Sequence, residues 1–293
     1  MTVAILGPGA VGGVLAVGLA DAGVDVVCIA RPATAEVIRS EGLSLRQGEN
    51  VQTARPRVAT ELVEPVELLL VTVKAPALDS ALDRVQARAE AVVPLLNGIE
   101  HMQLLRSRLP ESQTVGATIG RIEAWLERPG VIAQPTPSVV MTVAEDVDDR
   151  TLGLLRSSGA EVKVNGSELE VLWEKLARQA ATAAATSITQ RPVGELRDDP
   201  EWGGRFRRAI EEACRIAAED GVTLSADAEW AIIESMPPLL TSSTARDIAA
   251  GVPSELDAIT GAVVRAGRRT GVATPELDRM LAEAEAACRA SSL

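Results

Sequence analysis

Hydrophobic residues in the first half of the chain gather in short continuous runs, separated by more polar stretches. The clearest runs have the length and the β-branched content of buried strands and cover residues 3–6, 24–30, 68–73 and 92–96. Weaker runs predict strands at 115–122, 130–134, 138–143 and 160–164, with Pro129, Pro135 and Pro137 at the turns. The intervening stretches predict helices at 14–22, 33–40, 77–91 and 151–158, and a hairpin of 43–46 with 51–54. Such alternation is typical of an α/β domain with a parallel sheet.

After residue 165 the hydrophobic positions repeat at helical spacing instead. Ser167 and Glu170 form an S-x-x-E capping box, and Leu172 and Leu176 follow on one helix face. Helices are predicted at 168–188, 201–220, 226–236, 254–270 and 275–289. The sequence therefore predicts an α/β, Rossmann-like dinucleotide-binding domain at 1–165, followed by an all-α domain at 166–293.

The glycines that follow the first apolar run have the G-x-G-x-x-G spacing. Gly7 allows a sharp turn off the strand, Gly9 lets a pyrophosphate approach the backbone, and Gly12 allows close packing of helix on strand. Ala10 and Val11 belong to the same motif and are expected at the cofactor, ahead of the helix predicted at 14–22, whose free N–H groups and partial positive charge favour phosphate. The strand–turn–helix context favours dinucleotide binding over a buried strand with incidental glycines.

Polar side chains follow three of the predicted strands and would lie at the cofactor crevice. Arg31, at the tip of the second strand, stands where an acidic residue would favour NAD, so it favours the 2′-phosphate of NADP. Lys74 and Asn97 follow the next two strands, at the edge where ligands bind in open α/β sheets. The alternative for Arg31 is a surface arginine at a strand end, and the cofactor role is favoured over it. Taken singly, Lys74 and Asn97 are more often a solvated cap or a plain turn.

Composition narrows the class of partner. The chain has 293 residues, a formal net charge of −12, and only 2% aromatic residues. Negative charge disfavours nucleic acid and anionic membrane surfaces, and few aromatics leave little stacking surface for single strands. No segment is interpreted as a membrane span, because the glycines explain the apolar N-terminal stretch better. We therefore expect a small-molecule ligand, with no nucleic acid and no membrane.

Cysteine and histidine usage disfavours a metal site. Cys28, Cys214 and Cys288 are odd in number and form no C-x-x-C pair, which disfavours a disulfide framework and a zinc site. A cytoplasmic location is the simplest interpretation. His101 is the only histidine, so a site of several histidines is excluded, and a surface position is expected for it rather than a ligand.

Several longer motifs occur in a characteristic order along the chain. They are GPGAVGG at the N-terminus, VTVKAPALDSAL around Lys74, PLLNGI around Asn97, RPGVIAQ, LWEKLA around Lys175, PVGEL, SST-x-x-DI after residue 241, and SELDAITGAVVRAGRRTGVATP from residue 254. In this order and spacing the chain resembles the ketopantoate (2-dehydropantoate) 2-reductase family over nearly its whole length. The resemblance implies NADPH-dependent reduction of a 2-oxo acid to a 2-hydroxy acid on the path to pantothenate, in a site between the domains.

The resemblance also implies roles for individual residues. Lys175 matches the family's catalytic lysine, Glu255 its substrate-contacting glutamate, and Ser243 its substrate-binding serine. Lys74 and Asn97 match its cofactor-site lysine and asparagine, and Asn97 is expected to reach the substrate as well.

Two positions depart from the family pattern. Gln179 and Ala183 stand where asparagines are common, one and two turns after Lys175. Gln179 keeps an amide, one methylene further out, whereas Ala183 has no polar group. A lost hydrogen bond in a desolvated site costs about 1–3 kcal/mol, so we expect altered substrate choice rather than lost chemistry.

The chemistry alone also favours a lysine. Reduction of a ketone builds negative charge on its oxygen, which needs a proton donor, and burial would lower the pKa of Lys175 towards a useful range. Glu255 could orient Lys175 or bond to the substrate hydroxyl. Without the resemblance, Lys175 would be interpreted as a solvated helix lysine and Glu255 as a helix-start residue.

The sequence leaves alternatives for the role of several polar residues and for the activity. Ser243 could be the N-cap of a helix that begins near Thr244, and Arg205, Arg207 and Arg208 are expected on a solvated face. The Ala-rich helix could support a homodimer. The rival functions are a paralogous reductase of another oxo substrate and a non-catalytic NADP-binding regulator.

Overall fold

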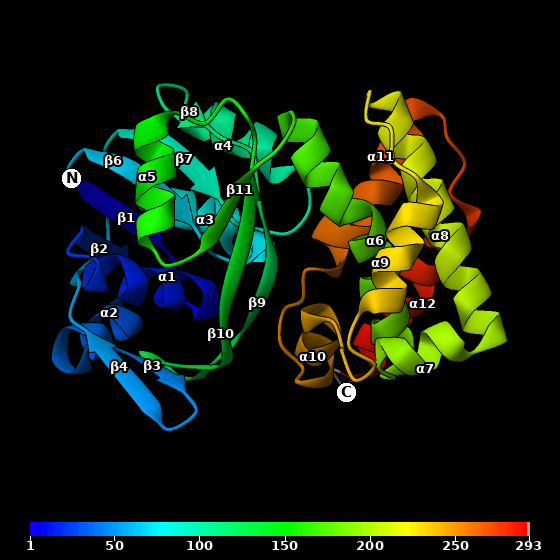
Figure 1. The fold of residues 1–293 in the computed structure, drawn as a ribbon, viewed down its shortest axis with the longest axis horizontal. Coiled ribbons are helices and arrows are strands. Elements are labelled where there is room, and N and C mark those ends of the chain that lie inside the picture. Colours follow the sequence, from blue (N-terminus) through cyan, green and yellow to red (C-terminus); the bar gives the residue numbers. More distant parts are fainter. Residues whose placement is uncertain (292–293) are drawn as a thin grey trace. The chain divides into compact units, whose positions relative to one another are not determined.

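The computed structural model describes residues 1–291, which divide by their contacts into two compact units (Figure 1). The first unit joins Met1–Leu96 with His101–Val171, and the second joins Asn97–Glu100 with the chain from Leu172 onward. A parallel α/β region is followed by a mostly helical one, as the sequence predicts. The division at residue 165 stays a prediction.

The centre of the first unit is a six-stranded, all-parallel sheet in the order β5-β2-β1-β6-β7-β8. Its strands are β1 (Thr2–Leu6), β2 (Asp25–Ile29), β5 (Arg57–Ala59), β6 (Val66–Val71), β7 (Ala89–Pro94) and β8 (Gln113–Thr114). Successive side chains of a strand point to opposite faces. Val3 and Ile5 of β1 therefore enter one buried cluster, whereas Ala4 and Leu6 enter another.

A second sheet has the order β11-β10-β3-β4, with β9 also paired to β10. Its strands are β3 (Leu43–Gln47), β4 (Asn50–Ala54), β9 (Ala117–Arg128), β10 (Val131–Val143) and β11 (Glu161–Val164). The helices of this unit are α1 (Ala10–Asp21), α2 (Pro32–Glu41), α3 (Leu78–Leu82), α4 (His101–Arg108) and α5 (Asp149–Ser157). The antiparallel pairing of β3 with β4 confirms the predicted hairpin.

Two predictions for this unit are wrong in detail, and some of its elements were not predicted. The helix predicted at 77–91 ends at Leu82, because tight turns follow and Gln86 then donates to the Leu62 carbonyl. The short strand β5 and the helix α4 have no counterpart in the predictions. Pro135 and Pro137 do not mark turns, because β10 runs through both. The pairing of β10 with β9 is irregular in register here, so the prolines, which have no backbone N–H, need not donate to a regular ladder of hydrogen bonds.

The second unit is built from helices around an aliphatic core. It comprises most of α6 (Glu168–Thr189), then α7 (Val193–Asp198), α8 (Pro200–Glu219), α9 (Ala226–Ser235), α10 (Ser243–Ala249), a π-helical turn (Asp257–Gly261), α11 (Ala262–Thr270) and α12 (Pro275–Ser291). Trp173 and Phe206 are fully buried in this core, together with the alanines of α6. None of the helices within residues 1–291 is long and apolar enough to cross a membrane.

Local sequence signals explain where several helices begin and end. Ser167 and Glu170 form the predicted capping box: the Ser167 backbone N–H donates to the Glu170 carboxylate at 2.6 Å, and the Glu170 N–H donates to Ser167 Oγ at 3.4 Å. Ser225 caps α9. Gly271 ends α11 with a φ of 79°, in the left-handed region where glycine carries no steric penalty.

Candidate functional site

The turn after β1 needs its glycines for distinct reasons. Gly7 has a φ of 87°, and a Cβ there would overlap Val73 of the loop after β6. A Cβ on Gly12 would lie 2.6 Å from the Gly7 carbonyl oxygen and would overlap Thr72 Oγ1. A Cβ on Gly9 would meet nothing closer than 3.9 Å. Protein packing therefore requires Gly7 and Gly12, and the space beside Gly9 is open.

The N-terminus of α1 has the features of an anion site. Ala10 and Val11 begin this helix, which has no side-chain cap and no acidic residue in its first turn within the described chain. The helix start therefore keeps its partial positive charge uncompensated. Thr72 Oγ1 donates to the Gly7 carbonyl at 2.8 Å, which ties the turn to the loop after β6.

Two basic residues flank this turn at the carboxyl edge of the sheet. The strand order reverses between β1 and β6, and ligands of open α/β sheets bind outside the carboxyl ends of strands at such a point. Arg31 follows β2 and Lys74 follows β6, the two neighbours of β1. Both side chains are exposed, and each residue directly precedes a helical segment: Arg31 precedes α2, and Lys74 precedes a short 3-10 turn (Ala75–Ala77).

Four predicted site residues form one hydrogen-bonded cluster in the second unit. Asn97 Oδ1 accepts from Lys175 Nζ at 2.7 Å and from Gln179 Nε2 at 2.9 Å. Asn97 Nδ2 donates to Glu255 Oε2 at 2.8 Å. Lys175 and Gln179 lie one turn apart on α6, and Glu255 precedes the π-helical turn. One asparagine side chain therefore joins three functional groups from two helical regions.

The cluster changes the acidity of the lysine. Desolvation lowers the pKa of Lys175 to about 8; the Glu255 carboxylate opposes this shift, and the Arg178 guanidinium adds to it. A lysine with a pKa near neutrality can give up a proton and recover it under ordinary conditions.

Sequence reasoning missed Arg178, although its position three residues after Lys175 on a helix was a usable signal. Arg178 Nη1 donates to Glu229 Oε2 of α9 at 2.8 Å, and the Glu229 side chain is only 7% exposed. This pair fixes a positive charge near Lys175.

Ser243 and Ala183 are not part of the hydrogen-bonded cluster. Ser243 is exposed in the first turn of α10, and Ser242, not Ser243, is the N-cap, accepting from the Ala245 N–H at 3.0 Å. Ser242 Oγ also lies 2.7 Å from Thr186 Oγ1 of α6. Ala183 is fully buried in the aliphatic core.

Two residues expected at the surface are buried. His101 begins α4 and is 6% exposed. Arg205 is 4% exposed, because its guanidinium donates to Glu276 at 2.7 Å and to Glu283 at 2.9 Å, and its charge is compensated inside the protein. Arg207 and Arg208 are exposed as predicted. Helical periodicity could not reveal the burial of Arg205, since its acidic partners lie on another helix.

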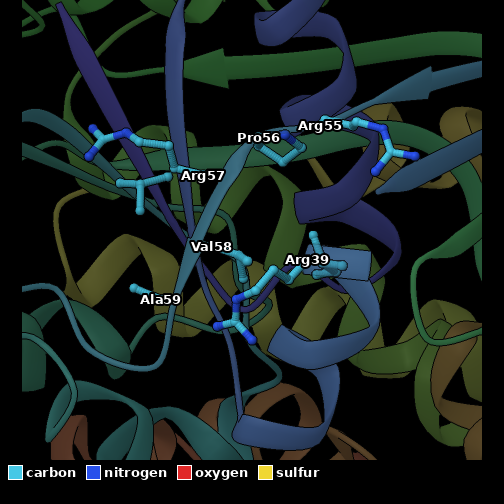
Figure 2. A pocket seen from close by; sticks show the side chains of 8 residues that line it. Arg39, Arg55, Pro56, Arg57, Val58 and Ala59 are labelled. Carbon is cyan, nitrogen blue, oxygen red and sulfur yellow. The ribbon is translucent and has the colours of Figure 1, made fainter. Parts of the chain in front are cut away.

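A separate pocket of about 460 Å³ lies at the β5 edge of the parallel sheet (Figure 2). None of the predicted site residues lines it. Figure 2 shows Arg55 and Arg57 extending to opposite sides of Pro56. Arg57 is already paired with Asp25 at 2.7 Å and with Glu64 at 3.4 Å. Arg39 forms an ion pair with Glu36, and Arg55 donates to the Ser40 carbonyl at 3.3 Å. Each arginine that lines the pocket therefore already has a partner among the described residues.

Comparison with known proteins identifies the family. The family described as "Ketopantoate reductase PanE/ApbA" matches residues 3–145, and its C-terminal counterpart matches residues 169–287. A 2-dehydropantoate 2-reductase of Caulobacter vibrioides is 30% identical over 285 residues, covering 94% of each chain. A 2-dehydropantoate 2-reductase of Mycobacterium tuberculosis is 28% identical and likewise covers 94% of both.

Solved structures show the same architecture. A PanE/ApbA family ketopantoate reductase from Ralstonia eutropha JMP134 superposes with a TM-score of 0.88, at 28% identity and full coverage of both chains. A D-mandelate dehydrogenase, solved with NADH and anilino(oxo)acetate, has a TM-score of 0.89 at 23% identity and full coverage, which is a likeness of fold. Both halves of the chain, and not the glycine motif alone, thus match one group of oxidoreductases, and the chain belongs to the PanE/ApbA ketopantoate reductase family.

Proposed function

We propose that this protein reduces a 2-oxo acid to the corresponding 2-hydroxy acid with NADPH, and that 2-dehydropantoate is its first candidate substrate. The observation that carries the proposal is the Lys175–Asn97–Glu255 cluster, in which the lysine has a pKa of about 8. Membership of the family supports the reaction class.

We infer that the first unit binds a nicotinamide dinucleotide with a 2′-phosphate. The open space beside Gly9 and the uncapped start of α1 would hold the pyrophosphate. Arg31, exposed after β2, and Lys74, exposed after β6, would bind the adenosine end with its phosphate. When bound, NADPH supplies the hydride for the substrate carbonyl carbon.

Lys175 would act as the general acid. As the carbonyl carbon gains the hydride, its oxygen becomes negative and takes a proton from the Lys175 ammonium, which later recovers one from water. Asn97 holds the lysine through its side-chain oxygen. The Glu255 carboxylate raises the pKa of Lys175, which favours the protonated lysine before transfer.

A second candidate is a different 2-oxo acid as the natural substrate. Gln179 Nε2 already donates to Asn97, and among the described residues Gln179 Oε1 is buried with no hydrogen-bond partner. Ala183, one turn on, offers no polar group. A buried acceptor without a donor fits a substrate that brings an N–H or O–H to Gln179, which the hydroxyl group of 2-dehydropantoate also does. A different substrate is therefore favoured only by the longer side chain of Gln179 and the missing polar group at Ala183.

The test is NADPH consumption, followed by absorbance, with 2-dehydropantoate and a panel of 2-oxo acids with and without hydroxyl groups. Fast turnover of 2-dehydropantoate supports the first candidate. Slow turnover of it, with a better substrate in the panel, supports the second. Tight NADPH binding without turnover of any member would contradict both and favour a regulator.

A further inference from the structure

The segment Asn97–Glu100 is held by the second unit, although the chain on either side of it belongs to the first. Gly98 has a φ of 90°, and a Cβ there would overlap the Ala258 carbonyl oxygen in the π-helical turn. Ile99 packs against the aliphatic core of the second unit. Asn97 therefore reaches Lys175 from a backbone that is docked closely beside Glu255.

One guanidinium binds both the segment that carries Asn97 and the segment that carries Glu255, and we call this contact the clamp. Arg265 of α11 donates to both carboxylate oxygens of Glu100, from Nε at 2.9 Å and from Nη2 at 2.7 Å. The same side chain donates to Asp257 Oδ1 at 2.6 Å and to the Asp257 carbonyl at 3.0 Å. Glu100 lies three residues after Asn97, and Asp257 lies two residues after Glu255.

We propose that Arg265 is a positioning residue, which holds Asn97 and Glu255 in register with Lys175 by bridging Glu100 and Asp257. This inference rests on the proposed function of Lys175. A planar guanidinium with two fixed donor pairs suits the role, because it sets the orientation of both carboxylates, which an ammonium would not.

Exposure shows that the bridge serves geometry more than stability. The side chains of Arg265, Glu100 and Asp257 are 39%, 48% and 81% exposed. Ion pairs that are this accessible contribute little to the free energy of unfolding. A shift of the Asn97 backbone would nevertheless disturb both of its hydrogen bonds to the reacting lysine and the glutamate, and small displacements of a catalytic group are costly.

The experiment compares Arg265→Gln and Glu100→Ala with Arg268→Gln as the matched control. Arg268 is on the same helix and forms an exposed ion pair with Asp278 rather than with Glu100 or Asp257. We expect kcat to fall about tenfold or more in the two clamp variants, with the KM for NADPH and the melting temperature unchanged. The double variant Arg265→Gln/Glu100→Ala should have the same kcat as Arg265→Gln alone, since both substitutions break one bridge.

A second readout does not require turnover. The pH dependence of acetylation of Lys175, measured by mass spectrometry of peptides with exposed Lys163 as internal reference, gives the pKa of Lys175. Glu255 and Arg178 are the charged groups that act on it. In Arg265→Gln and Glu100→Ala we expect water to gain access to the lysine, so the pKa of Lys175 should rise from about 8 towards its ordinary value. In Arg268→Gln the pKa of Lys175 should stay at about 8.

The two readouts separate the possible failures. An unchanged Lys175 pKa and unchanged kcat in both clamp variants would overturn the positioning role. A shifted pKa in a protein that turns over no 2-oxo acid would uphold the clamp and reject the proposed reaction.

Discussion

Asn97 Oδ1 accepts the Lys175 ammonium at 2.7 Å, although 78 residues separate the two in the chain. The same oxygen accepts from Gln179, and the amide of Asn97 donates to Glu255. With one side chain serving all three groups, a change to any of them alters the surroundings of Lys175.

The first prediction concerns pH. Desolvation lowers the pKa of Lys175 to about 8. If Lys175 is the general acid that we propose, reduction needs its protonated form. With saturating NADPH, kcat/KM for the oxo acid should be constant below pH 8 and fall about tenfold per pH unit above it. Oxidation of the hydroxy acid needs the neutral amine and should rise through the same pH. A reduction rate that stays flat to pH 10 would contradict the assignment of the general acid.

Lys175→Met is the companion variant to this profile. It should lose about 10²–10⁴-fold in kcat, because the positioned proton donor is gone, and the remaining rate should no longer follow the lysine's pKa. NADPH affinity, measured by fluorescence titration, should stay close to that of the unaltered protein.

The second prediction concerns substrate choice. Gln179→Asn shortens the side chain by one methylene, which withdraws the amide from its 2.9 Å bond to Asn97 and frees it for a ligand. If 2-dehydropantoate is the substrate, its kcat/KM should rise by up to about tenfold, the value of one recovered hydrogen bond. Gln103→Asn, at an exposed position in α4, is the control. A fall in 2-dehydropantoate turnover would instead show that Gln179 fits the natural substrate.

The third prediction separates two glycines of one motif. Gly9→Ala should leave the melting temperature unchanged, since the new Cβ meets no protein atom within 3.9 Å, yet weaken NADPH at least about tenfold by blocking the pyrophosphate. Gly12→Ala should lower the melting temperature, because its Cβ would lie 2.6 Å from the Gly7 carbonyl oxygen. Thermal unfolding with and without NADPH measures both effects. Equal NADPH affinity of Gly9→Ala and the unaltered protein would count against the proposed pyrophosphate position.

The fourth prediction concerns the choice between NADPH and NADH. Arg31→Ala should weaken NADPH at least about tenfold and leave NADH nearly unchanged, because the guanidinium would contact only the 2′-phosphate. Arg39→Ala is the matched control, since Arg39 lies on the adjacent helix and forms an exposed ion pair with Glu36. If the ratio of the two affinities stays the same in Arg31→Ala, another residue must recognise the phosphate.

Local patterns were enough to predict much of the fold. The glycine turn after β1, the β3–β4 hairpin and the capping box of α6 depend on residues close together in sequence, and all three are confirmed. The wrong predictions concern segments whose structure depends on contacts with distant parts of the chain. The helix predicted after Lys74 stops early because Gln86 bonds to Leu62, and β10 continues through Pro135 and Pro137 because β9 pairs irregularly beside them.

The candidate site was predictable as residue types but not as a network. Lys175 and Gln179 could be placed on one helix face from their spacing. Asn97 follows a strand of the parallel sheet, and its side chain joins both of them and Glu255. This contact depends on the packing of a four-residue segment against the second unit, which the spacing of hydrophobic residues does not predict. The burial of His101 and Arg205 likewise depends on tertiary neighbours.

The packing of Asn97–Glu100 with the second unit has an evolutionary consequence. Because this segment is encoded before the helical half but packs with it, no single crossover near residue 165 exchanges the helical unit as an intact module. A chimera made at that junction would pair the lysine and Arg265 of one parent with the asparagine and Glu100 of the other. Recombination between relatives would succeed only where both parents keep these pairs compatible, so the four residues should be inherited as one co-varying set.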